Sequence, residues 1–214
     1  MLLELYVFDW SGVISDDRKP VYESNMRLFD HFGIPNIPFE DWKRRSTLSS
    51  VQILRDHNVT EKMAKDHEIQ EMYEKNLDDV IKEGTVPKVY PEAREVLEFL
   101  RNRGKILSVV SSHPEKNLLD EAEGYGVKIY FDLIIAGSGE KKHVKLRETF
   151  TRFGKKPEDV LYTGDTIFDI KEAKKAGVHS ACVCNGYHER EDLEKENPEF
   201  IFENLSELRR LKVF

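Results

Sequence analysis

The sequence predicts an α/β protein: a Rossmann-like parallel sheet of about five strands, with helices on both faces and an inserted α-helical cap domain. Three observations predict this fold class. Short apolar runs recur along the chain, and helical patterns separate them. Most of these runs are continuous rather than alternating, which is typical of strands buried on both faces of a parallel sheet. One long stretch, 14–86, contains helical patterns without a strong strand.

The predicted strands and helices alternate along the chain. The apolar runs lie at 3–8, 106–111, 131–136, 160–163, 180–184 and 200–202. Helical patterns lie between them at 92–103, 115–123, 144–153 and 170–175. In the first of these helices, Pro91 lies in the first turn and Gly104 follows the end, an arrangement common at helix termini. Such alternation predicts parallel strands joined by right-handed crossovers.

The inserted stretch is expected to form a separate helical cap. Its helical patterns lie at 21–32, 49–56 and 60–82. Thr60 is expected to be the N-cap of the longest helix, because a hydroxyl can accept a hydrogen bond from a free amide there. The core resumes near Tyr90. We therefore predict an α/β core formed by 1–13 and 87–214, and a cap formed by 14–86.

Composition and charge argue against several classes of protein. The chain has 214 residues, 39% of them apolar and 34% charged, and a net charge of −7. An acidic chain is a poor candidate for a general nucleic-acid binder, and no run approaches the roughly 18 apolar residues of a membrane span. Two cysteines cannot make a disulfide framework, and the first residues do not resemble a signal peptide. We expect a cytoplasmic monomer or homodimer without nucleic-acid or membrane partners.

Carboxylates follow the first and the fourth predicted strands. Asp9 ends the first strand and precedes the turn residue Gly12, while Asp165 and Asp169 bracket the turn after the fourth. Because the carboxyl ends of parallel strands meet at one edge of the sheet, we expect these side chains to lie together. Such a cluster is costly without a cation, and oxygen ligands favour Mg²⁺. Alternatively, the last two aspartates cap the following helix, an interpretation that suits Asp169 best.

Groups that could bind an anion follow the second and third predicted strands. Ser111 and Ser112 precede a predicted helix, where a hydroxyl and free amides make an anion site. An ordinary helix cap is the alternative for these serines. Lys141 and Lys142 follow the third strand. Either lysine could balance the charge of a phosphate and of the carboxylates, and the alternative for each is an exposed surface position.

These residues occur in an order that resembles a known family. An Asp-x-x-Gly-Val segment begins at Asp9, a serine follows the second strand, a lysine follows the third, and Gly-Asp-Thr-x-x-Asp begins at Gly164. The ordered set resembles the haloacid dehalogenase-like hydrolase superfamily, whose members are mostly phosphatases. The stretches 89–104 and 160–177 are similar to its phosphoglycolate-phosphatase-like branch, and the helical insertion resembles the small helical cap of the family. The resemblance covers nearly the whole chain.

The resemblance implies a Mg²⁺-dependent phosphatase that hydrolyses a small phosphorylated metabolite. Asp9 would be the nucleophile and would form an aspartyl-phosphate. The side chains of Asp9 and Asp165 and the backbone carbonyl of Ser11 would hold the Mg²⁺ ion, with Asp169 close by or acting through water. Positioning and electrostatics do most of the work in such transfers.

The resemblance also assigns groups to the phosphate of the substrate. Ser111 would bond a phosphoryl oxygen with help from the amide of Ser112. Lys141 would neutralise charge in the transition state. Counted from Gly154, the usual spacing of the family lysine falls near Glu140. Both lysines therefore remain candidates for this role, and Lys142 is taken as a substrate-binding residue.

One position departs from the family pattern. Family phosphatases carry a second aspartate two residues after the nucleophile, which protonates the leaving group and then activates water; here that position is Ser11. General acid–base catalysis is worth about 10²–10⁴ in rate, and a serine hydroxyl is a poor acid and a poor base. Three interpretations follow. The substrate has a good leaving group; Asp16, Asp17 or His113 replaces the aspartate; or the protein is slow or inactive and acts as a binding or regulatory protein.

A second enzyme class shares this departure. Phosphonoacetaldehyde hydrolases lack the same aspartate and have alanine in a segment that resembles the one starting at Asp9. They need a cap lysine that forms a Schiff base with the aldehyde, for which Lys43 is the candidate. Close by in the cap, Arg45 could bind an anionic group of the substrate. Dehalogenase chemistry is disfavoured because it needs no metal, which would leave Asp165 unexplained.

Overall fold

The computed structural model describes residues 2–45, 49–137 and 141–211, and the chain divides into two compact units. An α/β unit consists of Met1–Asp16 and Lys88–Phe214, and a helical unit consists of Asp17–Pro87. These boundaries lie close to positions 14 and 86, where the sequence pattern changes.

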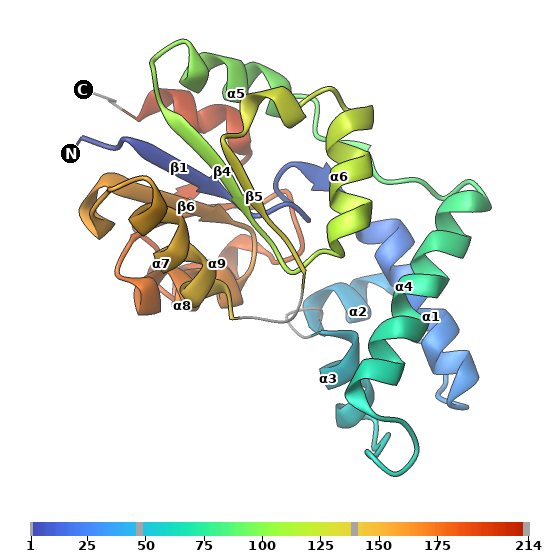
Figure 1. Ribbon diagram of the computed structural model, residues 1–214. Coiled ribbons are helices and arrows are strands. Elements are labelled where there is room, and N and C mark those ends of the chain that lie inside the picture. Colours follow the sequence, from blue (N-terminus) through green and yellow to red (C-terminus); the bar gives the residue numbers. More distant parts are fainter. Residues whose placement is uncertain (1, 46–48, 138–140, 212–214) are drawn as a thin grey trace. The chain divides into compact units, whose positions relative to one another are not determined.

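A parallel sheet of six strands forms the centre of the α/β unit (Figure 1). Its strands are β1 (Leu5–Phe8), β4 (Ile106–Val110), β5 (Leu133–Ile135), β6 (Val160–Gly164), β7 (His179–Val183) and β8 (Phe200–Phe202). The order across the sheet is β5-β4-β1-β6-β7-β8, and neighbouring strands are parallel. The prediction of a parallel sheet of about five strands is confirmed, and the sheet has six. Its edge strand β8 has only 3 residues. A separate antiparallel pair joins β2 (Ser15–Asp16) to β3 (Lys88–Val89).

Helices cover both faces of the sheet, as Figure 1 shows. On one face lie α5 (Ala93–Arg101) and α6 (Glu115–Gly124), and on the other lie α7 (Lys142–Arg152) and α8 (Ile167–Ala176). The remaining elements of this unit are α9 (Arg190–Lys195) and the 3₁₀ helices η1 (Lys128–Tyr130), η2 (Pro157–Asp159) and η3 (Leu205–Arg210).

The packing of β1 explains why its sequence is apolar without interruption. Side chains alternate between the two faces of a strand. Tyr6 and Phe8 pack with α5 and α6, whereas Leu5 and Val7 pack with α7 and α8. All four side chains are fully buried. A central strand covered on both faces therefore has no polar side, and its sequence does not alternate.

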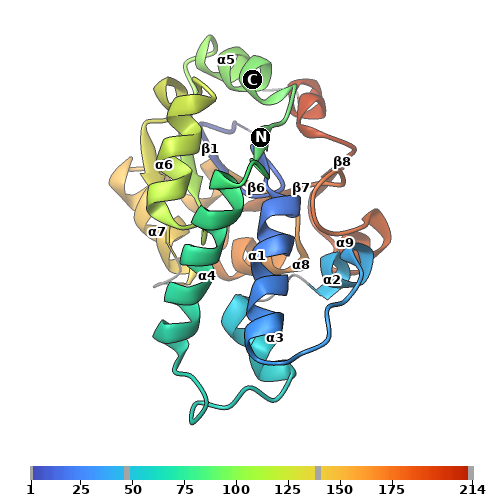
Figure 2. The same ribbon diagram turned by 90° about the vertical axis from the view of Figure 1, so that its right-hand side faces the viewer.

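The helical unit contains α1 (Arg18–His31), α2 (Phe39–Arg45), α3 (Ser50–Asp56) and α4 (Asp66–Lys82). The long helices α1 and α4 pack side by side (Figure 2). The prediction of Thr60 as the N-cap of α4 was wrong. Its carbonyl accepts from the amides of Met63 and Ala64 in a separate turn. The N-cap residue of α4 is Lys65, and the helix begins six residues after Thr60, at Asp66. Within the described residues, no helix is both long and apolar enough to cross a bilayer.

Candidate active site

The register of the sheet brings functional side chains to one edge. Phe8 of β1 pairs with Val109 of β4 and with Thr163 of β6. Residues that follow these three strands therefore leave the sheet close together at its carboxyl edge, where open α/β sheets bind ligands. They are Asp9, Ser111 and Asp165.

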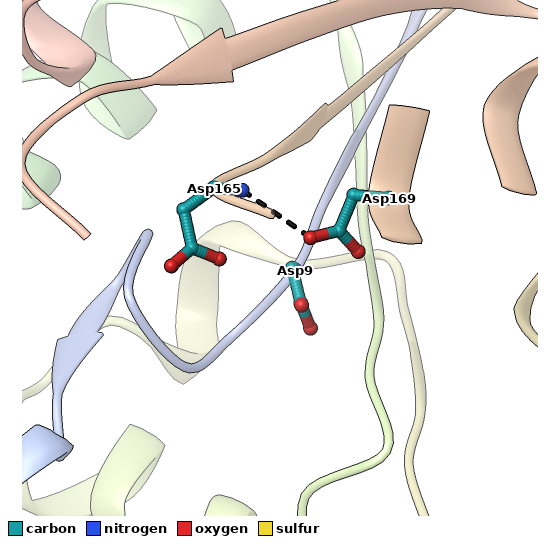
Figure 3. Close-up of side chains that lie close together, drawn as sticks. All are labelled: Asp9, Asp165 and Asp169. Carbon is teal, nitrogen blue, oxygen red and sulfur yellow. Dashed lines mark hydrogen bonds between the residues drawn. The ribbon is translucent and has the colours of Figure 1, made fainter. Parts of the chain in front are cut away.

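Three carboxylates converge at this edge (Figure 3). Asp9, Asp165 and Asp169 each contribute an oxygen, and these oxygens lie within 4.8 Å of one another. All three side chains are buried. The backbone amide of Asp165 donates to Oδ2 of Asp169 at 3.3 Å, which ties two of the three together. The structure therefore brings together the carboxylates that the sequence placed after separate strands.

Lys142, the first residue of α7, contacts this cluster. Its Nζ lies 2.5 Å from Oδ2 of Asp9 and 2.7 Å from Oδ1 of Asp169, and its side chain is only 8% exposed. Lys141 is the N-cap residue of α7, and its side chain is exposed. Of the two lysines that the sequence left open, Lys142 contacts the carboxylates, whereas the side chain of Lys141 is exposed.

Burial and charge together set the protonation of the cluster. Burial raises the pKa of Asp9; the charge of Lys142 opposes this rise and the charge of Asp169 adds to it, and the pKa remains raised. Burial also acts to raise the pKa of Asp169, but Lys142 and hydrogen bonds from Thr166 and Tyr162 hold that pKa below its usual value. Burial acts to lower the pKa of Lys142, and the two carboxylates more than offset this and raise it. The lysine is therefore charged.

Asp169 also caps α8. The amide of Asp169 donates to Oγ1 of Thr166 at 3.3 Å, and the amide of Thr166 donates to Oδ2 of Asp169 at 3.0 Å, which together form a capping box. The other oxygen, Oδ1, accepts from the hydroxyl of Tyr162 at 2.9 Å and from Lys142. The carboxylate of Asp169 therefore caps α8 through Oδ2 and contacts Lys142 through Oδ1.

Asp165 lies in a cradle that contains two glycines. Its Oδ2 accepts from the backbone amide of Tyr187 at 2.7 Å. A Cβ on Gly12 would lie 2.0 Å from this oxygen, and a Cβ on Gly186 would lie 2.3 Å from it. Gly12 also has a φ of +74°, which favours glycine. The Oδ1 atom is buried and has no hydrogen-bond partner among the residues that the structure describes.

The cluster fits a hard divalent cation. Burial, followed by the charges of Asp169 and Asp9, raises the pKa of Asp165 well above its usual value. If all three carboxylates ionise, the ammonium of Lys142 leaves an excess of two negative charges. The donor atoms are carboxylate oxygens, which suit Mg²⁺ better than a softer metal. The buried Oδ1 of Asp165 offers a ligand atom without breaking a hydrogen bond to a described residue.

Ser111 lies beside Asp9, whereas Ser112 is exposed. A hydrogen bond from the side chain of Ser111 opposes the rise in the pKa of Asp9 that burial causes. The buried Lys145 holds the loops after β4 and β5 together, since its Nζ donates to the carbonyl of Ser111 at 3.1 Å and to that of Gly137. The sequence interpretation missed Lys145. The feature that could have identified it is the position of a lysine on the buried face of α7.

Comparison with known proteins identifies the family. A model of the haloacid dehalogenase-like hydrolase family matches residues 6–183. The chain belongs to this family. The matched range contains Asp9, Ser111, Lys142, Asp165 and Asp169.

Two relatives of this haloacid dehalogenase-like hydrolase match nearly its whole length, and a third matches about half of it. The phosphoglycolate phosphatase of Aquifex aeolicus is 30% identical over 217 residues, which cover 98% of this chain and 96% of the relative. That of Haemophilus influenzae is 26% identical, with 96% of each chain covered. That of Vibrio parahaemolyticus is 33% identical over 124 residues, 56% of this chain and 54% of the relative.

Solved structures of the family share the fold. A haloacid dehalogenase-like family hydrolase from Streptococcus pneumoniae has a TM-score of 0.80 at 18% identity, with 97% of each chain covered. A haloacid dehalogenase-like protein of unknown function from Agrobacterium tumefaciens has a TM-score of 0.78 at 20% identity, with 98% of this chain and 97% of that one covered. At these identities the similarity concerns the fold alone.

This haloacid dehalogenase-like hydrolase has a hydrogen-bonded serine two residues after Asp9. The Oγ of Ser11 lies 3.2 Å from Nδ1 of His113, and Nε2 of His113 lies 3.2 Å from Oε1 of Glu121. His113 was one of three predicted replacements for the missing aspartate, but Glu121 was not predicted. The feature that could have identified Glu121 is the position of an acidic residue on the buried face of α6, next to Ala122.

The other predicted residues belong to other elements, or their side chains lie outside the described residues. Asp16 belongs to β2, and Asp17 is the N-cap residue of α1 in the helical unit. Lys43 lies in α2 and forms an ion pair at 3.5 Å with a glutamate one turn earlier. Arg45 ends α2, and its side chain lies outside the described residues, as does Glu140.

Proposed function

We propose that the chain catalyses the Mg²⁺-dependent hydrolysis of a phosphate monoester of a small metabolite, with Asp9 as the nucleophile. The observation that carries the proposal is the buried contact of Lys142 with both Asp9 and Asp169, beside Asp165. This arrangement holds a carboxylate at the ligand-binding edge of the sheet and cancels part of its charge. The charge that remains is complementary to a divalent ion.

Each residue around Asp9 has a role in the proposed reaction. Asp9 attacks phosphorus, and the bond from phosphorus to the leaving oxygen breaks as the bond to Asp9 forms. Lys142 orients Asp9 and opposes the negative charge on the phosphoryl oxygens. The hydroxyl of Ser111 donates to one of those oxygens, and the amide of Ser112 assists it. Water then attacks the phosphorus of the aspartyl-phosphate, which releases phosphate and regenerates Asp9.

The same carboxylates would hold the metal. Asp9, Asp165 and Asp169 are the side-chain ligands, and the backbone carbonyl of Ser11 is the further ligand that family membership implies. When bound, Mg²⁺ supplies positive charge that reduces repulsion between the carboxylates and a phosphate dianion. The glycine cradle keeps Asp165 in the position from which it would bind the ion.

The relatives support a small anionic substrate. The phosphoglycolate phosphatase of Aquifex aeolicus aligns with nearly the whole chain at 30% identity. This similarity favours a phosphate monoester of a short carboxylic acid, such as 2-phosphoglycolate. In this proposal the helical unit, Asp17–Pro87, is the cap.

The test is the release of inorganic phosphate from p-nitrophenyl phosphate and from 2-phosphoglycolate. Nitrophenolate needs little protonation, so Ser11 should hinder its departure least. We expect turnover that EDTA abolishes and Mg²⁺ restores, and background turnover in Asp9→Asn. Full activity of Asp9→Asn would exclude the aspartyl-phosphate route.

Ser11 is the observation that favours two other functions, and the same assay separates them. A phosphonoacetaldehyde hydrolase would cleave phosphonoacetaldehyde but neither phosphate ester, and Lys43→Ala would abolish that cleavage. A binding or regulatory protein would bind phosphate and turn over none of the three compounds.

A further inference from the structure

A continuous chain of hydrogen bonds leads from Ser11 into the interior of the α/β unit. The Oγ of Ser11 lies 3.2 Å from Nδ1 of His113, and Nε2 of His113 lies 3.2 Å from Oε1 of Glu121. The other carboxylate oxygen of Glu121 accepts from Nε1 of Trp10 at 2.7 Å and from Oγ of Ser15 at 2.8 Å. Ser11 is partly exposed, and the other four residues are buried.

Glu121 is the negatively charged end of this chain. Burial acts to raise the pKa of this carboxyl, but interactions with His113 and hydrogen bonds from Trp10 and Ser15 hold it below the usual value. An ionised carboxylate only accepts hydrogen bonds, so Nε2 of His113 carries the hydrogen that points at Glu121. The nitrogen that can gain or lose a proton is then Nδ1, and it faces the hydroxyl of Ser11.

Packing holds the histidine and the glutamate in place. The amide of His113 donates to Oγ of Ser111 at 3.2 Å, which anchors the histidine to the loop beside Asp9. The ring of Trp10 stacks on that of Tyr125, with centroids 6.0 Å apart and planes 10° apart. Groups held in this way need little reorientation before a proton moves, which is what an acid–base site requires.

We propose that His113 and Glu121 enable the hydroxyl of Ser11 to replace the acid–base aspartate of the family. The proposal rests on the phosphatase function proposed above and deepens it. Ser11 lies two residues after Asp9 and is the member that meets the reacting atoms. His113 acts through Ser11 by storing the proton at Nδ1. Glu121 acts through His113 as a positioning residue that fixes the tautomer and the orientation of the ring.

The proton returns to its starting position over the two steps of the reaction. In the first step, Asp9 attacks phosphorus and the ester bond to the leaving oxygen breaks. The leaving oxygen takes the proton of the Ser11 hydroxyl, and Ser11 takes the proton from Nδ1 of His113. In the second step, a water oxygen attacks phosphorus and the bond to Asp9 breaks. One water proton passes to Ser11, the Ser11 proton passes to Nδ1, and phosphate leaves.

The experiment compares two leaving groups in His113→Asn and Ser11→Ala. The alkoxide of 2-phosphoglycolate needs a proton when it leaves, whereas nitrophenolate does not. We expect kcat/KM for 2-phosphoglycolate to fall about 10²–10³-fold in both variants, within the usual range for general acid–base catalysis. For p-nitrophenyl phosphate, kcat/KM should change less than about threefold, because its first step needs no acid. In Glu121→Gln, kcat/KM for 2-phosphoglycolate should fall by a smaller factor than in His113→Asn. For p-nitrophenyl phosphate, kcat/KM should again change less than about threefold.

A second readout follows the phosphoenzyme. With p-nitrophenyl phosphate, His113→Asn should release one nitrophenolate per active site in a burst and then turn over slowly, because the attacking water lacks a proton acceptor. Intact-mass measurement during this slow phase should find one phosphoryl group on the protein. In terms of kinetic constants, kcat and KM fall together while kcat/KM is retained. A distorted site would instead lower kcat/KM for both substrates alike.

The matched control is His179→Asn. His179 also pairs with a glutamate, Glu199, but it lies at the amino end of β7, away from the site edge of the sheet. In His179→Asn, kcat/KM for 2-phosphoglycolate and for p-nitrophenyl phosphate should both equal the wild-type values. Ser11→Ala removes only a hydroxyl, so it tests the relay even if His113→Asn fails to fold.

Equal losses on both substrates, or no loss on either, in Ser11→Ala and in folded His113→Asn would overturn the relay. Failure of the proposed function gives a different result. In that case the wild-type protein turns over neither ester, and the relay is overturned with the function on which it rests.

Discussion

The Nζ atom of Lys142 lies 2.5 Å from Oδ2 of Asp9 and 2.7 Å from Oδ1 of Asp169. One ammonium group therefore bridges the proposed nucleophile and the carboxylate that caps α8. Because all three groups are buried, solvent and salt screen the interaction little. The preceding residue, Lys141, is exposed, so the chain itself offers a matched comparison for the role of this lysine.

Lys142→Met should lower kcat/KM about 10²–10³-fold, because it removes charge stabilisation at the phosphoryl group. In Mg²⁺-free buffer it should also reduce the free energy of unfolding by about 3–5 kcal/mol, since it leaves buried carboxylates uncompensated. Lys141→Met should change kcat/KM and the free energy of unfolding little. Steady-state kinetics and urea unfolding measure both effects. A larger kinetic loss in Lys141→Met than in Lys142→Met would contradict the assignment.

Asp165→Asn should separate metal binding from folding. At a Mg²⁺ concentration of 100 times Kd, the ion should stabilise the wild-type protein by about 2.7 kcal/mol. The variant should lose most of this gain, because its amide does not carry the charge that holds the ion. In Mg²⁺-free buffer the variant should be at least as stable as wild type at pH 8, because the raised pKa of Asp165 makes its ionisation costly.

Thermal melts with and without Mg²⁺ test this prediction, and isothermal titration calorimetry gives the affinity. Asp192→Asn, a substitution in α9, is the control and should keep the full Mg²⁺ effect. An Asp165→Asn protein with wild-type Mg²⁺ affinity would show that Asp165 does not bind the ion.

Gly186→Ala should displace Asp165. The added Cβ would lie 2.3 Å from Oδ2 and 2.5 Å from Cβ of that aspartate, which is closer than packed atoms approach. We expect Mg²⁺ affinity to fall at least about tenfold and the free energy of unfolding to fall by about 1–3 kcal/mol, the usual cost of overpacking. At Gly124, the last residue of α6, a Cβ would meet no described atom within 4 Å.

Calorimetric Mg²⁺ titrations and chemical unfolding of Gly186→Ala and Gly124→Ala measure these effects. Gly124→Ala should match wild type in Mg²⁺ affinity. Equal affinities for all three proteins would mean that the glycine cradle does not position a metal ligand.

Glu172 should contribute stability that disappears in acid. This buried carboxylate accepts from the amide of His143 at 2.9 Å, from Nδ1 of His143 at 2.6 Å and from Nζ of Lys175 at 2.7 Å. Burial acts to raise its pKa, but these interactions hold the pKa below its usual value. A lowered carboxyl pKa stabilises the folded state above the unfolded pKa of about 4.3, and the gain is lost as pH falls through the folded pKa.

Glu172→Gln should therefore be less stable than wild type by about 1.5–3 kcal/mol at pH 7, the range for hydrogen bonds to a charged group. The difference should shrink as pH falls below about 5. Urea unfolding of both proteins between pH 3 and 7 measures it. A difference that grows toward low pH would contradict the sign of the pKa shift.

Much of the fold and part of the site could be predicted from local patterns. The continuous apolar runs identified the strands because a strand covered on both faces lacks a polar side. Chain order then placed Asp9, Ser111 and Asp165 after strands of one parallel sheet. The N-cap of α4 was misplaced at Thr60, because several residues near a helix start can act as a cap and local sequence does not choose among them.

By itself, the sequence determined the α/β class, the helical insertion and the aspartates at the ends of the strands. These features depend on hydrophobic periodicity and on the order of elements along the chain, and both are visible in the linear sequence. Only the tertiary structure decided that Lys142 rather than Lys141 contacts Asp9, and that Ser11, His113 and Glu121 form one chain of hydrogen bonds. The physical reason is that a contact between distant side chains depends on helix start, rotation and packing, and a shift of one residue turns a helical side chain by about 100°.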